Sequence, residues 1–77
     1  MFCKKVFASR LSGLRKAKGL SREDLASELG LTYFSVAKME NGERACSIEI
    51  LYALSNFLGV SSDYLIGITD TPKGGIP

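Results

Sequence analysis

The chain has 77 residues, a formal net charge of +2, two cysteines and no histidine. This length suits one small domain with an economical core, because a chain of this size buries barely enough surface to offset its conformational entropy. Without histidine, C-x-x-C spacing or an apolar run of about 18 residues, the sequence argues against a metal site, a cofactor site and a membrane-spanning helix.

Charge is distributed unevenly. Residues 1–22 carry a net charge of +7, whereas residues 23–77 carry −5. The basic half favours a polyanion partner; alternatively it is a solvated face balanced in space by the later acids. The first residues are too charged and too short for a signal peptide, so we expect a cytoplasmic protein. Two unpaired thiols are the simpler expectation for Cys3 and Cys46, with one disulfide as the alternative.

Helical periodicity recurs along the chain, and each periodic segment runs into a glycine that suits a helix C-cap. These glycines are Gly19, Gly30, Gly42, Gly59 and Gly67. Hydroxyl residues that can cap a first turn open most of the segments. They are Ser21, Thr32, Ser47 and Ser61. The pattern predicts helices at residues 4–18, 22–29, 33–41, 48–58 and 62–66, and no sheet.

The first predicted helix places Phe7, Leu11 and Leu14 on one apolar stripe. Gly13 interrupts this helix at a cost of about 1 kcal/mol relative to alanine, so we expect another helix to approach closely there.

Residues 22–41 have the layout of a helix-turn-helix, whose second helix usually enters a DNA groove. Ala26 is small enough to let two helices cross, Gly30 suits the corner, and Val36 suits the angle between the helices. This set of residue types at these spacings favours a helix-turn-helix over an ordinary helical hairpin.

The fourth predicted helix carries two apolar stripes. Leu54 and Leu58 suit the core, whereas Ile50, Ala53 and Phe57 form a second stripe that a monomer does not need. We therefore expect a homodimer interface on this helix and the next one. The residues expected in it are Ile50, Ala53, Phe57, Tyr64 and Ile66. Residues 68–77 contain two prolines and two glycines without periodicity, and are expected to be irregular.

The stretches GLSREDLASELGLTYFSVAKMENG and LGVSSDYLIG resemble the Cro and phage-repressor helix-turn-helix family, also called the xenobiotic-response-element family. The resemblance spans roughly residues 7–67. It implies an all-α, compact five-helix lambda-repressor-like DNA-binding domain, which we assign to residues 1–67. Members of this family commonly act as dimeric transcriptional repressors, so the implied partners are double-stranded DNA and a second copy of the chain.

The resemblance also implies roles for individual residues. Those implied to face base edges are Tyr33, Phe34, Ala37 and Lys38. Those expected to contact phosphates are Lys18, Arg22, Ser35, Asn41 and Arg44, of which Lys18 is added for its place in the basic half. Arg15 and Glu40 match an internal salt bridge, and Arg22 stands where the family usually has glutamine. Alternatively, Tyr33 and Phe34 pack on the surface without reading bases, and Lys38 bonds a phosphate.

These observations predict a sequence-specific DNA-binding transcriptional regulator, a repressor, that binds a near-palindromic operator as a homodimer. The alternative is a protein-interaction module of the same fold that does not bind DNA, since residues 22–41 hold two basic and four acidic side chains. An enzyme is not expected, because the chain has neither histidine nor a glycine-rich phosphate loop after a strand.

Overall fold

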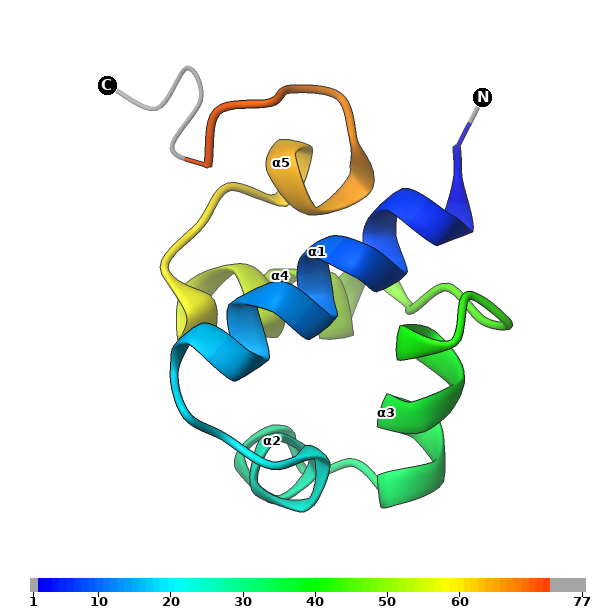
Figure 1. Cartoon of the computed structure of the whole chain (residues 1–77), viewed down its shortest axis with the longest axis vertical. Helices are drawn as coiled ribbons and strands as arrows, with labels where there is room; N and C mark the ends of the chain where they lie inside the picture. The colour runs from blue at the N-terminus through cyan, green and yellow to red at the C-terminus, as the bar shows by residue number, and fades with distance from the viewer. Residues whose placement is uncertain (1, 73–77) are drawn as a thin grey trace.

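Five α-helices and no strand occupy residues 2–72, which are the residues that the computed structural model describes (Figure 1). The helices are α1 (Lys4–Ala17), α2 (Arg22–Leu29), α3 (Tyr33–Glu40), α4 (Ile48–Leu58) and α5 (Ser62–Ile66). The expected all-α, five-helix fold is confirmed. Only the ends of α1 and α3 differ from the predicted bounds, by one residue each. Part of the predicted tail, residues 73–77, lies outside the described residues.

Side-chain hydrogen bonds at the starts of α2, α3, α4 and α5 explain why these four helices begin where they do. The Ser21 hydroxyl accepts from the Asp24 amide at 3.0 Å, and the Asp24 carboxylate accepts from the Ser21 amide at 3.0 Å, which completes a capping box. The bond that the Asp24 carboxylate accepts from the Ser21 backbone, and then an interaction of that carboxylate with the Ser21 side chain, lower the pKa of the Asp24 carboxyl. The side chains of Thr32, Ser47 and Ser61 accept equivalent bonds at the starts of α3, α4 and α5.

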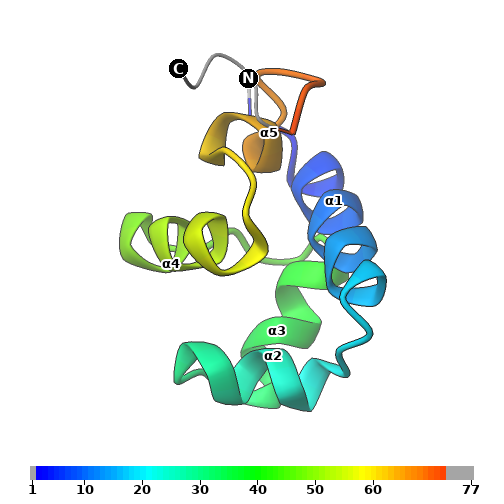
Figure 2. The same ribbon diagram turned by 90° about the vertical axis from the view of Figure 1, so that its left-hand side faces the viewer.

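One apolar cluster holds the helices together. α1 packs against α3 and α5, while α2 packs against α3 and α4. Figure 2 shows α2 and α3 together at one end of the molecule and α5 at the other, with α1 and α4 between them. The buried members of the cluster are Phe7, Leu11, Leu25, Ala26, Val36, Met39, Leu54, Leu58, Val60 and Leu65. The pair α2–α3 is thus fixed on a frame built from the other three helices.

Arg10 of α1 fastens the segment that follows α5. Its Nη1 donates to the carbonyl oxygens of Tyr64 and Thr69, both at 2.6 Å, and its Nη2 donates to the Asp70 carboxylate at 2.9 Å. The guanidinium also lies 4.2 Å from the centroid of the Tyr64 ring. Residues 68–72 form no helix or strand, and the bonds of Arg10 tie them to α1 and α5.

Both thiols are free, with Cys3 exposed and Cys46 half-buried, so the disulfide alternative does not apply. Within residues 2–72, no three histidine, cysteine or carboxylate side chains gather where they would hold a metal ion. No helix of this part of the chain has the length and apolar character needed to cross a membrane.

The close helix contact predicted at Gly13 is wrong. A Cβ atom placed there would find open space, with nothing within 4 Å outside its own helix backbone and chain neighbours. Gly13 is exposed, so nothing in the packing of the described residues explains its place within α1.

Replacing Gly13 with alanine should therefore raise the free energy of unfolding by about 1 kcal/mol, because alanine restricts the unfolded chain and fits α1 without a clash. For a domain of this size the melting temperature, followed by circular dichroism, should rise by roughly 4–8 °C. Gly67→Ala is the matched control and should lower it, because Gly67 has a φ of +91° and its Cβ would stand 3.2 Å from Val6 Cγ1. An unchanged melting temperature in Gly13→Ala would contradict this account.

Candidate nucleic-acid interface

α2 and α3 meet at a tight corner. Gly30 adopts a φ of 66°, in the left-handed region that glycine reaches without strain, and the Leu31 amide donates to the Ala26 carbonyl at 2.8 Å. Ala26 is 4% exposed and Val36 is fully buried in the angle between the helices. The two helices and the corner predicted for residues 22–41 are thus present, and the small Ala26 side chain lets α3 approach α2.

The outer face of α3 carries the residues expected to read bases. Phe34 is 73% exposed and Tyr33 is 42% exposed, with their ring centroids 6.0 Å apart in an edge-to-face arrangement. Lys38 is also exposed, whereas Ala37 is half-buried. α3 therefore presents two aromatic rings and one ammonium group on a helix whose opposite side is locked into the core.

The residues expected to bind phosphates do not all lie together. Arg44 Nη1 donates to Ser35 Oγ at 3.4 Å, so these two side chains share one edge of α3, and Asn41 is exposed at its C-terminal end. Lys18 instead places its Nζ 5.5 Å from the centroid of the Phe57 ring, which belongs to α4. Among the predicted phosphate ligands, Lys18 is thus turned towards α4.

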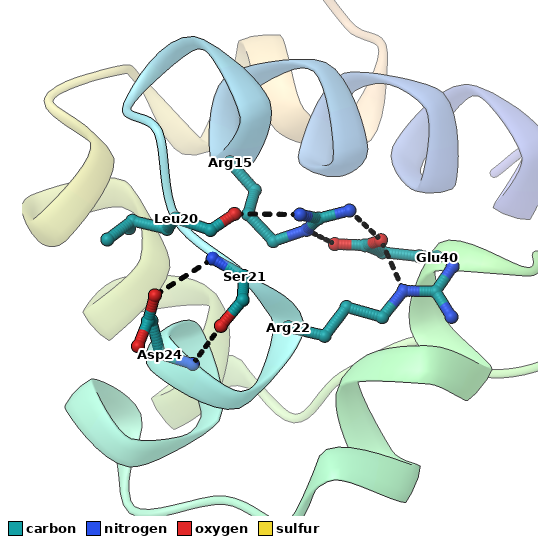
Figure 3. Close-up of polar contacts among 6 residues, drawn as sticks. All are labelled: Arg15, Leu20, Ser21, Arg22, Asp24 and Glu40. Carbon is teal, nitrogen blue, oxygen red and sulfur yellow. Dashed lines mark hydrogen bonds and ion pairs between the residues drawn. The ribbon is translucent and has the colours of Figure 1, made fainter.

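A buried carboxylate joins three helices at the edge of the motif (Figure 3). Glu40, at the end of α3, has a fully buried side chain and accepts two bonds from Arg15 of α1: Nε to Oε2 at 2.6 Å and Nη2 to Oε1 at 3.0 Å. Arg15 Nη1 also donates to the Leu20 carbonyl at 2.8 Å. The internal Arg15–Glu40 salt bridge implied by the family resemblance is therefore present, and it is bidentate.

Arg22 is a second partner of the same carboxylate, which the sequence analysis did not foresee. Its Nε donates to Glu40 Oε1 at 3.0 Å. Proximity to the Tyr33 side chain, and then the bond with Glu40, raise the pKa of the Arg22 guanidinium, which stays charged at any physiological pH. The available signal was the arginine itself, which stands where the family usually has glutamine.

Fewer acidic side chains of residues 22–41 are exposed than the sequence count suggests. Two basic and four acidic residues lie in 22–41, but Glu40 is internal and paired with two arginines. The other acids are Glu23, Asp24 and Glu28, which all belong to α2. α3 therefore exposes Lys38 and no carboxylate of its own.

The second apolar stripe predicted on α4 packs largely within the monomer. Ile50, Phe57 and Tyr64 are partly buried and pack against the core cluster, and Ala53 and Ile66 are half-buried. The exposed apolar side chains of α4 are instead Ile48 (84%) and Tyr52 (70%), which were not predicted. The two stripes lie on different sides of the helix, and helical spacing alone did not reveal which one the core would use.

Comparison with known proteins identifies the family. A family model described as helix-turn-helix matches residues 11–65. The chain belongs to the Cro/C1-type helix-turn-helix family. The matched region runs from the middle of α1 to the end of α5 and so includes the frame as well as the motif.

Relatives of this helix-turn-helix protein are regulators by name. It is 39% identical over 61 residues to the SPbeta prophage-derived uncharacterized HTH-type transcriptional regulator YonR of Bacillus subtilis; the match covers 79% of this chain but only 56% of that protein. Among solved structures it resembles the restriction-modification controller protein C.AhdI of Aeromonas hydrophila, with 37% identity, a TM-score of 0.73 and coverage of 80% and 94% of the two chains.

A second solved structure is the P22 c2 repressor protein, which was determined in complex with a synthetic operator. Its identity to this helix-turn-helix protein is 28%, its TM-score is 0.76, and the match covers 79% of this chain and 92% of that one. Together these comparisons confirm the lambda-repressor-like fold expected from the sequence.

The two arginines on Glu40 should differ in their effect on stability. Arg15→Met should lower the free energy of unfolding by about 3 kcal/mol, because it leaves a buried carboxylate with one partner instead of two and orphans the Leu20 carbonyl. Arg22→Met keeps the bidentate pair, and its side chain is 30% exposed, so the loss should stay below about 1 kcal/mol. Urea unfolding followed by circular dichroism measures both, and equal losses would contradict the assignment of Arg15 as the main partner.

Proposed function

We propose that this protein is a sequence-specific regulator of transcription, a repressor, that places α3 in the major groove of duplex DNA. The observation that carries this proposal is the outer face of α3, where exposed Tyr33, Phe34 and Lys38 project from a helix whose inner side is fixed in the core. Aromatic rings can contact thymine methyl groups, and an ammonium group can bond guanine O6 or N7. With Ala37 beside them, these residues are the proposed base readers.

Positive and polar side chains around the edge of α3 are proposed to bind the DNA backbone. Arg22 lies at the start of α2, while Ser35 and Arg44 lie together beside α3 and Asn41 follows its last turn. The first turns of α2 and α3 add backbone amides and the positive ends of their helix dipoles. Lys18 is proposed as a more distant backbone contact on the side of α4.

A homodimer is proposed because one reading helix contacts only a few base pairs. Two copies on a near-palindrome would place their α3 helices about 34 Å apart, one turn of DNA. The outer face of α4, with exposed Ile48 and Tyr52, supplies the apolar surface that best supports this association, and Ala53 borders it. Ile50, Phe57, Tyr64 and Ile66 have less free surface to offer, because they are half-buried in the monomer.

A protein-interaction role is the second candidate. The observation that favours it is the exposed edge-to-face pair Tyr33–Phe34, since aromatic side chains are enriched in protein interfaces. The two candidates differ in their dependence on salt, because binding to DNA releases counterions from each neutralised phosphate.

Lys38→Ala tests the reading role. If Lys38 bonds a base, the variant should bind a duplex selected from a random pool about 1–3 kcal/mol more weakly and lose preference at one base pair. Equal losses on all duplexes would make Lys38 a phosphate contact instead. The control is Lys4→Ala in the first turn of α1, outside α2 and α3, which should leave the sequence preference unchanged.

The same titrations, repeated over a range of salt, separate the two candidate functions. About three phosphates neutralised by each protomer predict a slope of log K against log salt near −5 for the dimer, at roughly −0.9 for each phosphate. Absence of duplex binding at low salt would leave the protein-interaction role as the candidate to pursue.

Tyr52→Asp tests the dimer surface. A carboxylate at the centre of the exposed α4 face should weaken self-association by at least tenfold in sedimentation equilibrium, with little change in the melting temperature, because Tyr52 is already 70% exposed. Ile68→Asp is the matched control: Ile68 is 71% exposed but lies beyond α5, so its replacement should leave association unchanged. A Tyr52→Asp variant as dimeric as the parent would move the interface away from this face.

A further inference from the structure

The cluster of Arg15, Glu40 and Arg22 leaves one positive charge uncompensated. Two guanidiniums share one carboxylate, and they differ in exposure to solvent. The Arg15 side chain is 10% exposed, whereas the Arg22 side chain is 30% exposed. Arg15 uses Nε and Nη2 on Glu40 and Nη1 on the Leu20 carbonyl, so all three of its nitrogens are engaged. Arg22 is therefore the arginine of the cluster whose positive charge is more accessible to solvent.

The bond from Nε determines which edge of Arg22 remains available. A guanidinium can grip two oxygens through its side edge, which contains Nε, or through its end edge, which consists of Nη1 and Nη2. Nε donates to Glu40 Oε1 at 3.0 Å, whereas Arg22 Nη1 and Nη2 donate no hydrogen bond within residues 2–72, and the guanidinium lies near the Tyr33 side chain. Figure 3 shows these two nitrogens on the side of the guanidinium away from the bond between Nε and Glu40. The end edge is thus free of Glu40.

The end edge suits a phosphate of the DNA backbone. Two parallel N–H groups fit two oxygens of one phosphate, and this bidentate geometry is specific to arginine. Tyr33, at the start of the reading helix, lies close enough to the Arg22 guanidinium to raise its pKa, so the group sits where α2 and α3 both begin. A phosphate bound there would lie beside the outer face of α3.

We infer that Glu40 is a positioning residue for DNA binding, which holds Arg22 by its Nε so that the Nη1–Nη2 edge is preset for one backbone phosphate. This inference rests on the proposed function, because it specifies how one of the proposed phosphate contacts is made. An arginine that is already held in place loses less conformational entropy when it binds a phosphate than a mobile arginine does. Arg15 supports the arrangement by fixing the second oxygen of Glu40.

The free protein offers the first test, which requires no variant. Nuclear magnetic relaxation of the side-chain Nε–H group should give Arg22 an order parameter near 0.8, close to that of rigid backbone, and the value should persist when a selected duplex is added. The matched control is Arg44, which is exposed and makes one long bond of 3.4 Å, so its order parameter should fall below about 0.6. An Arg22 as mobile as Arg44, or one that leaves Glu40 in the complex, would overturn the inference.

Substitutions of Arg22 provide the second test and keep the bidentate Arg15–Glu40 pair. Arg22→Lys retains the charge, but the three N–H groups of its ammonium diverge from one nitrogen, so it cannot offer a phosphate two parallel donors while it bonds Glu40. It should therefore bind the selected duplex about tenfold more weakly for each protomer, close to the loss in Arg22→Met. Wild-type affinity in Arg22→Lys would show that charge alone suffices, and wild-type affinity in Arg22→Met would show that no phosphate is bound; either result would overturn the inference.

The parent protein distinguishes this inference from the function on which it rests. If the parent binds no duplex from the pool at low salt, the proposed function fails, and this inference fails with it. If the parent binds a duplex but Arg22→Met binds it equally well, only the role of Glu40 and Arg22 is rejected. Circular dichroism melting of each variant confirms that its affinity is measured on folded protein.

Discussion

A single buried carboxylate fixes the geometry on which the rest of the structure depends. Glu40 ends α3, and its partners Arg15 and Arg22 lie near the end of α1 and at the start of α2. A buried carboxylate is stable only when its oxygens are paired, so the three helices cannot change their relative positions without leaving charge unsatisfied. The apolar core supplies the stability, while this ionic contact restricts the orientation of α3 relative to its frame.

The same contact explains how an acidic motif can face a polyanion. Counted along the sequence, residues 22–41 carry a net charge of −2. In the folded chain Glu40 is turned inwards and neutralised, and the remaining acids lie on α2, so α3 has no exposed carboxylate. Residue counting treats all charges as equally exposed, whereas the field outside the protein is set by those that stay at the surface.

Local signals in the sequence were sufficient for the fold. The starts of α2, α3, α4 and α5 depend on a hydroxyl that bonds an amide in the first turn, and each connection between helices contains a glycine with positive φ, so both can be recognised from a few neighbouring residues. The Arg15–Glu40 pair came from the family resemblance instead, because its partners are 25 residues apart. No local pattern indicates such a contact.

Side-chain orientation between helices was harder to predict. On α4, periodicity identified two apolar stripes but not that Phe57 would turn to the core and Tyr52 to solvent, because the outcome depends on how α4 rotates against α2 and α5. The second partner of Glu40 and the bonds of Arg10 to the chain after α5 were missed for the same reason. Both are set by the meeting of segments 18 or more residues apart.

The most direct test of the central claim is a map of backbone amide shifts by nuclear magnetic resonance, recorded while a duplex selected from a random pool is added. We expect the largest changes at Arg22 and along residues 33–38, with the outer face of α4 affected only through dimer formation. Changes confined to α4 and α5, with α3 unaffected at saturating duplex, would contradict the central claim.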